Sequence, residues 1–214
     1  MNWGIIKKTC DPTVEKHGYH DRRVKEHIRQ ECHCKCVYCA IHENTLGGIQ
    51  SFHVEHYRPK KIFPKLENKL SNLFYACPIC NRFKSMDWPA EPRKNFSNPS
   101  YPDPSKVDYS VLFKISSKDG YVQGLYTASK YMIEKLYFNR PQLILERRQY
   151  FLDQQLQECY SRSDALSNQL QKINNKKSRA LLSKLLTSST KIGNLVLEAK
   201  NIPSYEIADV SRRK

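Results

Sequence analysis

Glycine, acidic side chains and long apolar runs are all scarce in this chain of 214 residues. None of its 7 glycines belongs to a glycine-rich phosphate-binding loop, so any step driven by a nucleoside triphosphate would have to come from another protein. No apolar run reaches the roughly 20 residues of a transmembrane helix, which argues against a membrane-spanning segment. The opening residues, Met1 to Gly4, do not resemble a secretory signal, and we expect a cytoplasmic protein with reduced thiols.

Basic side chains are in clear excess. The chain has 36 Lys and Arg against 21 Asp and Glu, a formal net charge of +15. Such a balance favours a polyanionic partner, because phosphate groups attract a basic surface regardless of sequence. A basic surface without a nucleic-acid role is the alternative that composition leaves open.

Four of the eight cysteines form two Cys-x-x-Cys pairs, Cys36 with Cys39 and Cys77 with Cys80. Each pair can aim two thiolates at one point, and two such pairs can close a tetrahedral structural zinc site. A disulfide framework is the alternative, and the absence of a secretory signal disfavours it. Cys32 or Cys34 could replace Cys36 as a ligand, but the matching spacing of the two pairs favours the four cysteines named first.

Between the two cysteine pairs, the sequence around Glu55 and His56 predicts a strand of a hairpin, preceded by a turn at Gly47 and Gly48. Neighbouring residues on a strand face opposite sides, so Glu55 can face a metal while His56 faces a substrate. A neutral imidazole makes His56 a candidate general base, and Glu55 offers a hard oxygen ligand. His53 shares the face of Glu55 and is either a further metal ligand or a packing residue.

Asn81 follows Cys80 directly, in the first turn of a short predicted helix that extends to Lys84. Its amide oxygen can supply a second protein ligand beside Glu55. A carboxylate and an amide oxygen, completed by water and phosphate, favour Mg²⁺ or Mn²⁺ over softer ions. The sequence therefore predicts a catalytic divalent ion next to the structural zinc.

The order of Glu55-His56, Asn72 and Asn81 between the cysteine pairs resembles the ββα-metal core of HNH endonucleases. The resemblance implies that His56 activates the attacking water, that Glu55 and Asn81 hold the metal, and that Asn72 braces the loop that carries His56. Asn81 stands where many members have histidine, which concerns the identity of the metal more than the activity. Across roughly residues 30 to 150, the chain is also similar to a group of bacterial HNH proteins that includes the nuclease subunit of Septu anti-phage systems. Those relatives are often paired with an ATPase partner.

Basic residues follow both halves of this motif, and we expect them to contact the phosphate backbone. The candidates are Arg58, Lys60, Arg82 and Lys84. A solvated rim is the alternative role. None of them would read bases, so the sequence does not indicate which DNA is preferred.

The remaining segments predict an α+β fold, with a zinc-stapled ββα-metal core and a mostly α-helical C-terminal extension. We expect a basic N-terminal segment (1–30), the nuclease core (31–100), and a C-terminal region (101–214). Within these, residues 20–31 predict a helix, 86–110 a proline-rich loop and 111–126 a hairpin. Leu152, Leu156 and Cys159 recur at helical spacing, and a basic amphipathic helix is expected over 176–200.

These observations together predict a metal-dependent endonuclease that hydrolyses DNA, with an anti-phage role and an ATPase partner implied by the resemblance alone. Two alternatives remain open. One is a zinc-stabilised nucleic-acid-binding module without catalysis, and the other is a nuclease directed at RNA, because the motif does not distinguish the two sugars.

Overall fold

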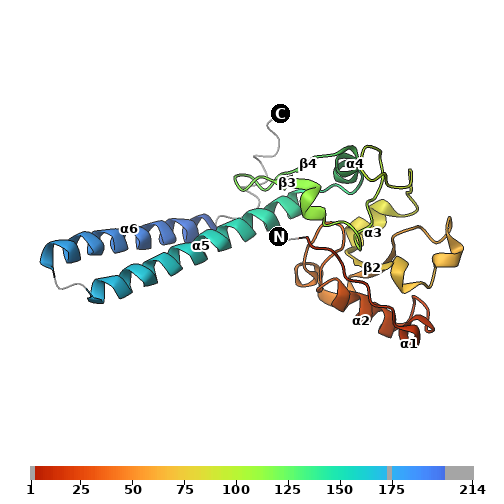
Figure 1. The fold of residues 1–214 in the computed structure, drawn as a ribbon, viewed down its shortest axis with the longest axis horizontal. Helices are drawn as coiled ribbons and strands as arrows, with labels where there is room; N and C mark the ends of the chain where they lie inside the picture. The colour runs from red at the N-terminus through yellow and green to blue at the C-terminus, as the bar shows by residue number, and fades with distance from the viewer. Residues whose placement is uncertain (1–2, 173–174, 201–214) are drawn as a thin grey trace. The chain divides into compact units, whose positions relative to one another are not determined.

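The computed structural model describes residues 3–172 and 175–200, and Figure 1 shows the arrangement of its elements. The strands are β1 (His53–His56), β2 (Leu73–Ala76), β3 (Phe113–Ile115) and β4 (Val122–Gly124). The helices are α1 (Pro12–Glu15), α2 (Arg22–Glu31), α3 (Pro78–Lys84), α4 (Thr127–Lys135), α5 (Pro141–Lys172) and α6 (Lys176–Lys200). The predicted α+β fold is confirmed.

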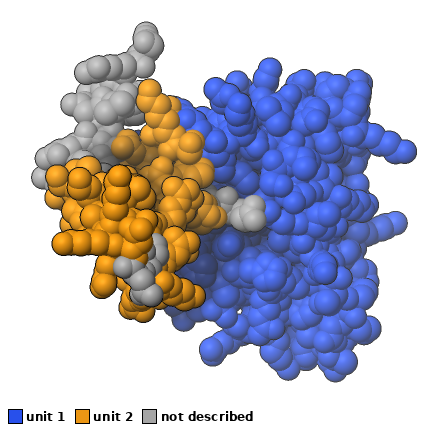
Figure 2. All heavy atoms as spheres, turned by 60° about the vertical axis from the view of Figure 1, so that its left-hand side comes forward, with its two compact units in different colours: residues 1–116, 121–143 blue, residues 117–120, 144–214 orange. Residues whose placement is uncertain are grey.

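The chain divides into two compact units, which Figure 2 colours separately. The first comprises residues 1–116 and 121–143, and the second comprises residues 117–120 and 144–214, of which 201–214 lie outside the described part. These units differ from the three segments expected from the sequence. Trp3 and Ile28 from the N-terminal segment and Phe138 from the C-terminal region lie in the same hydrophobic core as the cysteine pairs.

The ββα core consists of β1, β2 and α3. β1 and β2 pair antiparallel, with His56 opposite Leu73 and Val54 opposite Tyr75. α3 begins directly after β2, with Pro78 at its first position and Cys77 as its N-cap, where the Cys77 sulfur accepts a hydrogen bond from the Cys80 N–H. Proline suits this position because its fixed φ matches a helix and its missing N–H is not needed there.

The strand predicted around Glu55 is confirmed, but its hairpin partner lies elsewhere. Gly47 and Gly48 have φ angles of +85° and +73° and connect two short 3-10 turns instead of two strands. The partner of β1 is β2, which begins 17 residues after His56. The intervening loop carries Arg58 and Lys60 and ends at Asn72.

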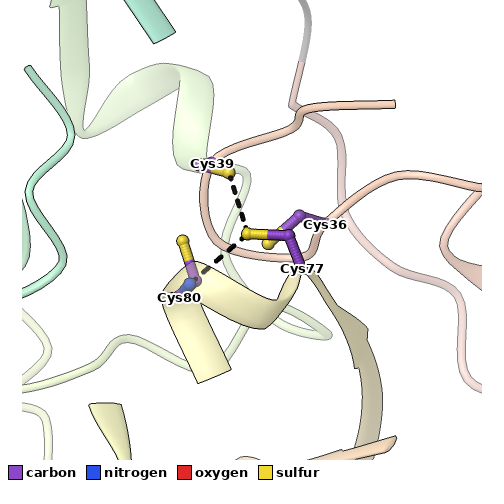
Figure 3. A group of neighbouring side chains, drawn as sticks. All are labelled: Cys36, Cys39, Cys77 and Cys80. Carbon is purple, nitrogen blue, oxygen red and sulfur yellow. Dashed lines mark hydrogen bonds between the residues drawn. The ribbon is translucent and has the colours of Figure 1, made fainter. Parts of the chain in front are cut away.

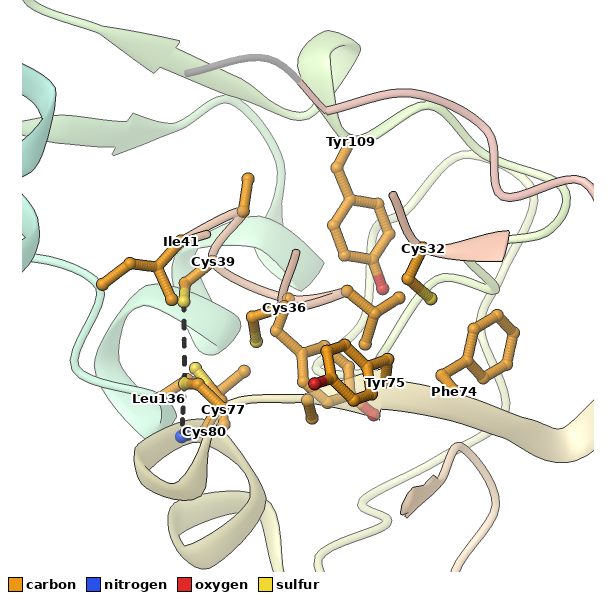
Figure 4. Close-up of a cluster of buried hydrophobic side chains, with 14 of the residues drawn as sticks. Cys32, Cys36, Cys39, Ile41, Phe74, Tyr75, Cys77, Cys80, Tyr109 and Leu136 are labelled. Atoms are coloured by element: carbon orange, nitrogen blue, oxygen red, sulfur yellow. Dashed lines mark hydrogen bonds between the residues drawn. The ribbon is translucent and has the colours of Figure 1, made fainter. Parts of the chain in front are cut away.

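Aromatic rings form much of the hydrophobic core around the β1–β2 pair. Phe52 stacks on Tyr75 with ring centroids 4.8 Å apart, and both side chains are fully buried. Figure 4 shows Tyr75, Phe74 and Tyr109 in one cluster with the cysteines. Trp3 joins this core through its indole N–H, which donates to the Tyr38 carbonyl over 2.9 Å.

The predicted hairpin over 111–126 is confirmed by the antiparallel pairing of β3 with β4. The predicted helical periods after residue 145 and over 176–200 are confirmed by α5 and α6. In the second unit these two helices run antiparallel, and the Ser163 and Ser189 hydroxyls meet at 2.8 Å between them. No helix in the described residues is both long and apolar enough to cross a membrane.

Candidate functional site

The four cysteines expected to bind zinc lie together in the structure. The sulfur atoms of Cys36, Cys39, Cys77 and Cys80 are all within 4.8 Å of one another and are buried (Figure 3). The Cys39 and Cys77 sulfurs are 3.8 Å apart, close to the roughly 3.8 Å between ligands of a tetrahedral site with Zn–S bonds of about 2.3 Å. Cys32 is buried but does not belong to this group. The geometry and the donor chemistry therefore fit a structural zinc ion.

The cysteines of this cluster differ in the direction in which their surroundings shift the thiol pKa. Burial raises the pKa of Cys36 and of Cys80 well above the usual thiol value. Burial acts the same way on Cys39, but hydrogen bonds from the other thiols outweigh it and lower the pKa of Cys39. A cluster that collects negative charge inside an apolar core needs a cation, whether a metal or a side chain, to offset it.

Arg140 supplies such a cation, and sequence reasoning did not identify it. Its guanidinium nitrogens lie 3.7 Å from the Cys39 sulfur, 3.9 Å from that of Cys77 and 4.0 Å from that of Cys80. Burial lowers the pKa of Arg140, but the charge of the three cysteines outweighs it and raises that pKa overall. Because Arg140 immediately precedes α5, far from the cysteines in sequence, no local pattern could have revealed this contact.

His56, at the end of β1, is half-buried. Its Nε2 lies 2.9 Å from the Glu67 carbonyl oxygen. A carbonyl only accepts hydrogen bonds, so Nε2 carries the proton of the neutral ring and Nδ1 holds the free lone pair. Burial is the main reason that the pKa of His56 is lowered, and the nearby charge of Lys60 lowers it further. The ring is therefore neutral near pH 7 and able to accept a proton at Nδ1.

Tyr19 covers this imidazole. Its ring meets the His56 ring edge-on, with centroids 4.7 Å apart and an interplanar angle of 76°. Lys60 also contacts Tyr19: its ammonium nitrogen lies 4.3 Å from the centroid of the Tyr19 ring and donates a hydrogen bond to the Tyr19 hydroxyl. Lys60 was predictable as a basic residue near the motif, but Tyr19 was not, because this contact joins residues 41 apart in the chain.

Asn72 holds the loop that follows β1. Its Oδ1 accepts from the Arg58 N–H at 2.8 Å, and its Nδ2 donates to the Arg58 carbonyl at 3.0 Å and to the Leu66 carbonyl at 3.2 Å. These bonds join the start and the end of the loop. They fix the backbone just after His56 and near Glu67, whose carbonyl orients the imidazole.

Glu55 faces inward and is 3% exposed. Its Oε1 is 2.7 Å from the Lys84 ammonium and accepts a hydrogen bond from the Tyr38 hydroxyl at 3.1 Å. Burial raises the pKa of Glu55, and the charge of Lys84 opposes this effect. Lys84 also donates to the His56 carbonyl at 2.9 Å, so the ion pair connects the two residues of the acid-histidine motif to α3.

The phosphate-contact candidates occupy different environments. Arg82 is exposed on α3, whereas Arg58 pairs with Glu91 at 2.7 Å and Lys60 pairs with Glu67 at 3.3 Å. Lys84 does not lie on the surface as expected: it is fully buried. Its position follows from helical period, since Lys84 comes four residues after the buried Cys80 and shares its inward face.

The carboxylate of Glu55 and the side-chain amide of Asn81 are oxygen donors of the kind that a hard divalent ion prefers, and water and phosphate would complete such a site. Asn81 lies three residues before Lys84 on α3, so the two side chains are neighbours along the helix. The side-chain amide of Asn81 makes no hydrogen bond within the described residues. His53 is exposed on β1. Lys84 already neutralises Glu55, so a cation at Glu55 requires the lysine to share or release the carboxylate.

Comparison with known families adds one finding. Residues 36–86 match the family model for the HNH endonuclease domain. The matched segment begins at Cys36, includes Glu55, His56 and Asn72, and ends just after α3. No curated protein is similar enough to the chain to count as a match. The family match supports a metal-dependent nuclease activity on nucleic acid in general.

Proposed function

We propose that this protein is a metal-dependent endonuclease that hydrolyses phosphodiester bonds in DNA, with His56 as the general base. One observation carries the proposal: the Glu67 carbonyl holds the His56 ring in the tautomer that leaves Nδ1 unprotonated. The pKa of His56, lowered chiefly by burial, keeps this tautomer neutral near pH 7. A buried carboxylate, Glu55, precedes this base directly.

In the proposed reaction, Nδ1 of His56 removes a proton from a water molecule as that water attacks the phosphorus. The hydrogen bond from Nε2 to the Glu67 carbonyl stabilises the imidazolium that forms. Tyr19 restricts rotation of the ring through its edge-on contact. Asn72 keeps the loop in the shape that places the Glu67 carbonyl, so its role is positioning rather than chemical.

Glu55 and Asn81 would hold a Mg²⁺ or Mn²⁺ ion, whereas His53, which is exposed on β1 while Glu55 is buried, would not. Such an ion, when bound, offsets the charge that develops on the leaving oxygen. Lys84 keeps Glu55 neutralised until then, which avoids an isolated buried charge. Arg82 is the candidate best placed to contact the phosphate backbone, because it is exposed beside Asn81.

A zinc ion at Cys36, Cys39, Cys77 and Cys80 would hold α3 against the first cysteine pair. This would fix the position of Asn81 relative to β1, since Asn81 follows Cys80 directly. The anti-phage role and the ATPase partner are supported only by the resemblance to bacterial HNH proteins, and they belong to this proposal on that basis alone.

One observation favours a second candidate function, a zinc-stabilised nucleic-acid-binding module without catalysis. The carboxylate of Glu55 is already engaged by Lys84 and Tyr38, as in a purely structural polar network. Such a module would bind DNA through its net charge of +15 and would need no divalent ion.

A plasmid cleavage assay distinguishes the two candidate functions. The purified full chain is incubated with supercoiled plasmid in Mg²⁺, Mn²⁺ or EDTA, and the products are separated on a gel. The nuclease proposal predicts nicked and linear products with a divalent ion and none with EDTA. A duplex RNA substrate in parallel tests the choice of sugar. Retention of plasmid without cleavage under all metal conditions would support the binding module.

A further inference from the structure

Helix α6 carries two rows of residues at coiled-coil spacing, and the first, here called the inner row, packs within the second unit. Its half-buried or buried members recur at spacings of four and three, as in the seam between two coiled helices: Leu182, Leu186, Ser189, Gly193 and Val196. Ser189 meets Ser163 of α5, and a Cβ at Gly193 would lie 3.8 Å from the Cys159 Cβ. This row accounts for the pairing of α6 with α5.

The second row, here called the outer row, consists of Leu181, Leu185, Ile192 and Leu195. These side chains are 62%, 48%, 53% and 62% exposed. They also follow heptad spacing, with Ser188 completing the pattern between Leu185 and Ile192. The outer row extends over about 21 Å of helix, at about 1.5 Å per residue. The inner row already accounts for the packing of α6 against α5, so the exposed apolar side chains of the outer row are not needed for that packing.

A row of exposed lysines lies beside the outer row. Lys177, Lys184 and Lys191 are seven residues apart; Lys184 directly precedes Leu185, and Lys191 directly precedes Ile192. In a coiled coil, these are flanking positions that form ion pairs with a partner helix. None of the three ammonium groups makes an ion pair with a carboxylate in the part of the chain that the structure describes. Across residues 176–200 there are 6 Lys and Arg against a single acidic residue, Glu198.

We propose that the outer row and its lysines form a docking surface for an acidic amphipathic helix of a partner protein. Leucines at coiled-coil spacing require an apolar stripe on the partner, which the backbone of a nucleic acid does not provide. The lysine row selects a partner with Glu or Asp at the flanking positions. A second copy of the chain fits less well, because its α6 would bring a like-charged row against this one. The surface lies outside residues 36–86 and does not depend on nuclease activity.

The probe is a synthetic helical peptide with Leu at the seam positions and Glu at the flanking positions. A matched peptide carries Lys in place of Glu. Binding of each fluorescent peptide to the full-length protein is measured by anisotropy. We expect the acidic peptide to bind at least about tenfold more tightly than the basic one, since complementary flanking charges set partner choice.

Two pairs of substitutions test the surface itself. Leu185→Ala with Ile192→Ala removes the two central apolar side chains of the outer row while keeping good helix formers, and should weaken acidic-peptide binding by about tenfold or more. Lys184→Glu with Lys191→Glu should reverse the preference towards the basic peptide. Thr187→Ala with Thr190→Ala changes exposed residues outside both rows, and Lys176→Glu changes a charge outside the lysine row. These control variants should bind like the wild type, and all variants should keep the wild-type circular dichroism.

Three results would overturn the proposal. Equal binding of the acidic peptide by the outer-row and control variants would remove its basis. Sedimentation of the wild type as a dimer that Leu185→Ala with Ile192→Ala dissociates would assign the surface to a second copy. Displacement of the acidic peptide by duplex DNA, with DNA affinity lost in the lysine variants, would assign it to nucleic acid.

Discussion

Glu55 and Lys84 form an ion pair from which water is almost entirely excluded. Removal of one partner of such a pair leaves a buried charge without compensation and destabilises a protein by about 3–5 kcal/mol. The pair also joins β1 to α3, the two elements that would share the divalent ion. The strength of this ion pair therefore determines whether Glu55 has a structural role only, or can also leave Lys84 to bind a metal ion.

The first prediction concerns this pair. Glu55→Gln and Lys84→Met should each lower the free energy of unfolding by several kcal/mol, and the double variant should lose less than the sum, by about 1–3 kcal/mol. Urea unfolding of the four proteins gives this coupling directly. Additive losses would mean that the two groups do not depend on each other.

His56 gives a second prediction, in the pH dependence of cleavage. A general base works when unprotonated, and burial together with Lys60 lowers the pKa of His56 below 6.5. Cleavage should therefore rise with pH through this lowered pKa and stay level above it. Lys60→Ala removes a positive charge that lowers the pKa, so the midpoint of the rise should move to higher pH.

The matched control is Lys61→Ala, which removes an exposed charge next in sequence. Its single-turnover rates between pH 5 and pH 8 should keep the wild-type midpoint. A midpoint that is the same in both lysine variants would show that Lys60 does not act on the base.

At the scale of elements, helix α3 depends on the cysteine cluster at one end and on Arg140 from the start of α5. The three sulfur contacts of Arg140 place a cation against the cysteine cluster. With zinc bound, four thiolates would carry more negative charge than one Zn²⁺ ion offsets. Groups of this kind commonly change metal affinity by 10-fold to 100-fold without being ligands.

The third prediction is that Arg140→Gln weakens zinc binding by about tenfold or more, and that Arg140→Lys restores part of it. Zinc transfer to a chromogenic chelator measures this without reference to activity. Arg82→Gln, which removes an exposed charge two residues after Cys80, should release zinc like the wild type. Equal release from Arg140→Gln and the wild type would refute the role of Arg140.

Elements with a local signal were predictable from the sequence. The cysteine spacing located the cluster, and alternation and helical period located β1, α3, the β3–β4 hairpin and the two long helices. The partner of β1 was missed because a turn signal at Gly47 and Gly48 says nothing about pairing across 17 residues. The burial of Lys84 was missed because a basic side chain near a motif suggests a phosphate contact; its spacing of four residues from Cys80 is the signal that could have placed it on the inward face.

For the whole molecule, the sequence indicated the class of substrate better than it indicated how the chain divides into compact units. The expected N-terminal and C-terminal segments contribute Trp3, Ile28 and Phe138 to one core with the two cysteine pairs. Such long-range packing has no sequence signature that a single chain reveals. The net charge of +15 and the HNH match at residues 36–86 both favour a nucleic-acid substrate, while the outer row of α6 favours a protein partner as well.

The measurement that tests the account most directly is plasmid cleavage by three proteins in the same divalent ion: the wild type, His56→Ala and His53→Ala. His53 is the matched control, because it is the other histidine of β1 and is exposed. The account predicts that His56→Ala loses at least about 100-fold in rate, the lower range for a general base, while its fold and zinc content are unchanged. Cleavage by His56→Ala at the wild-type rate would contradict it.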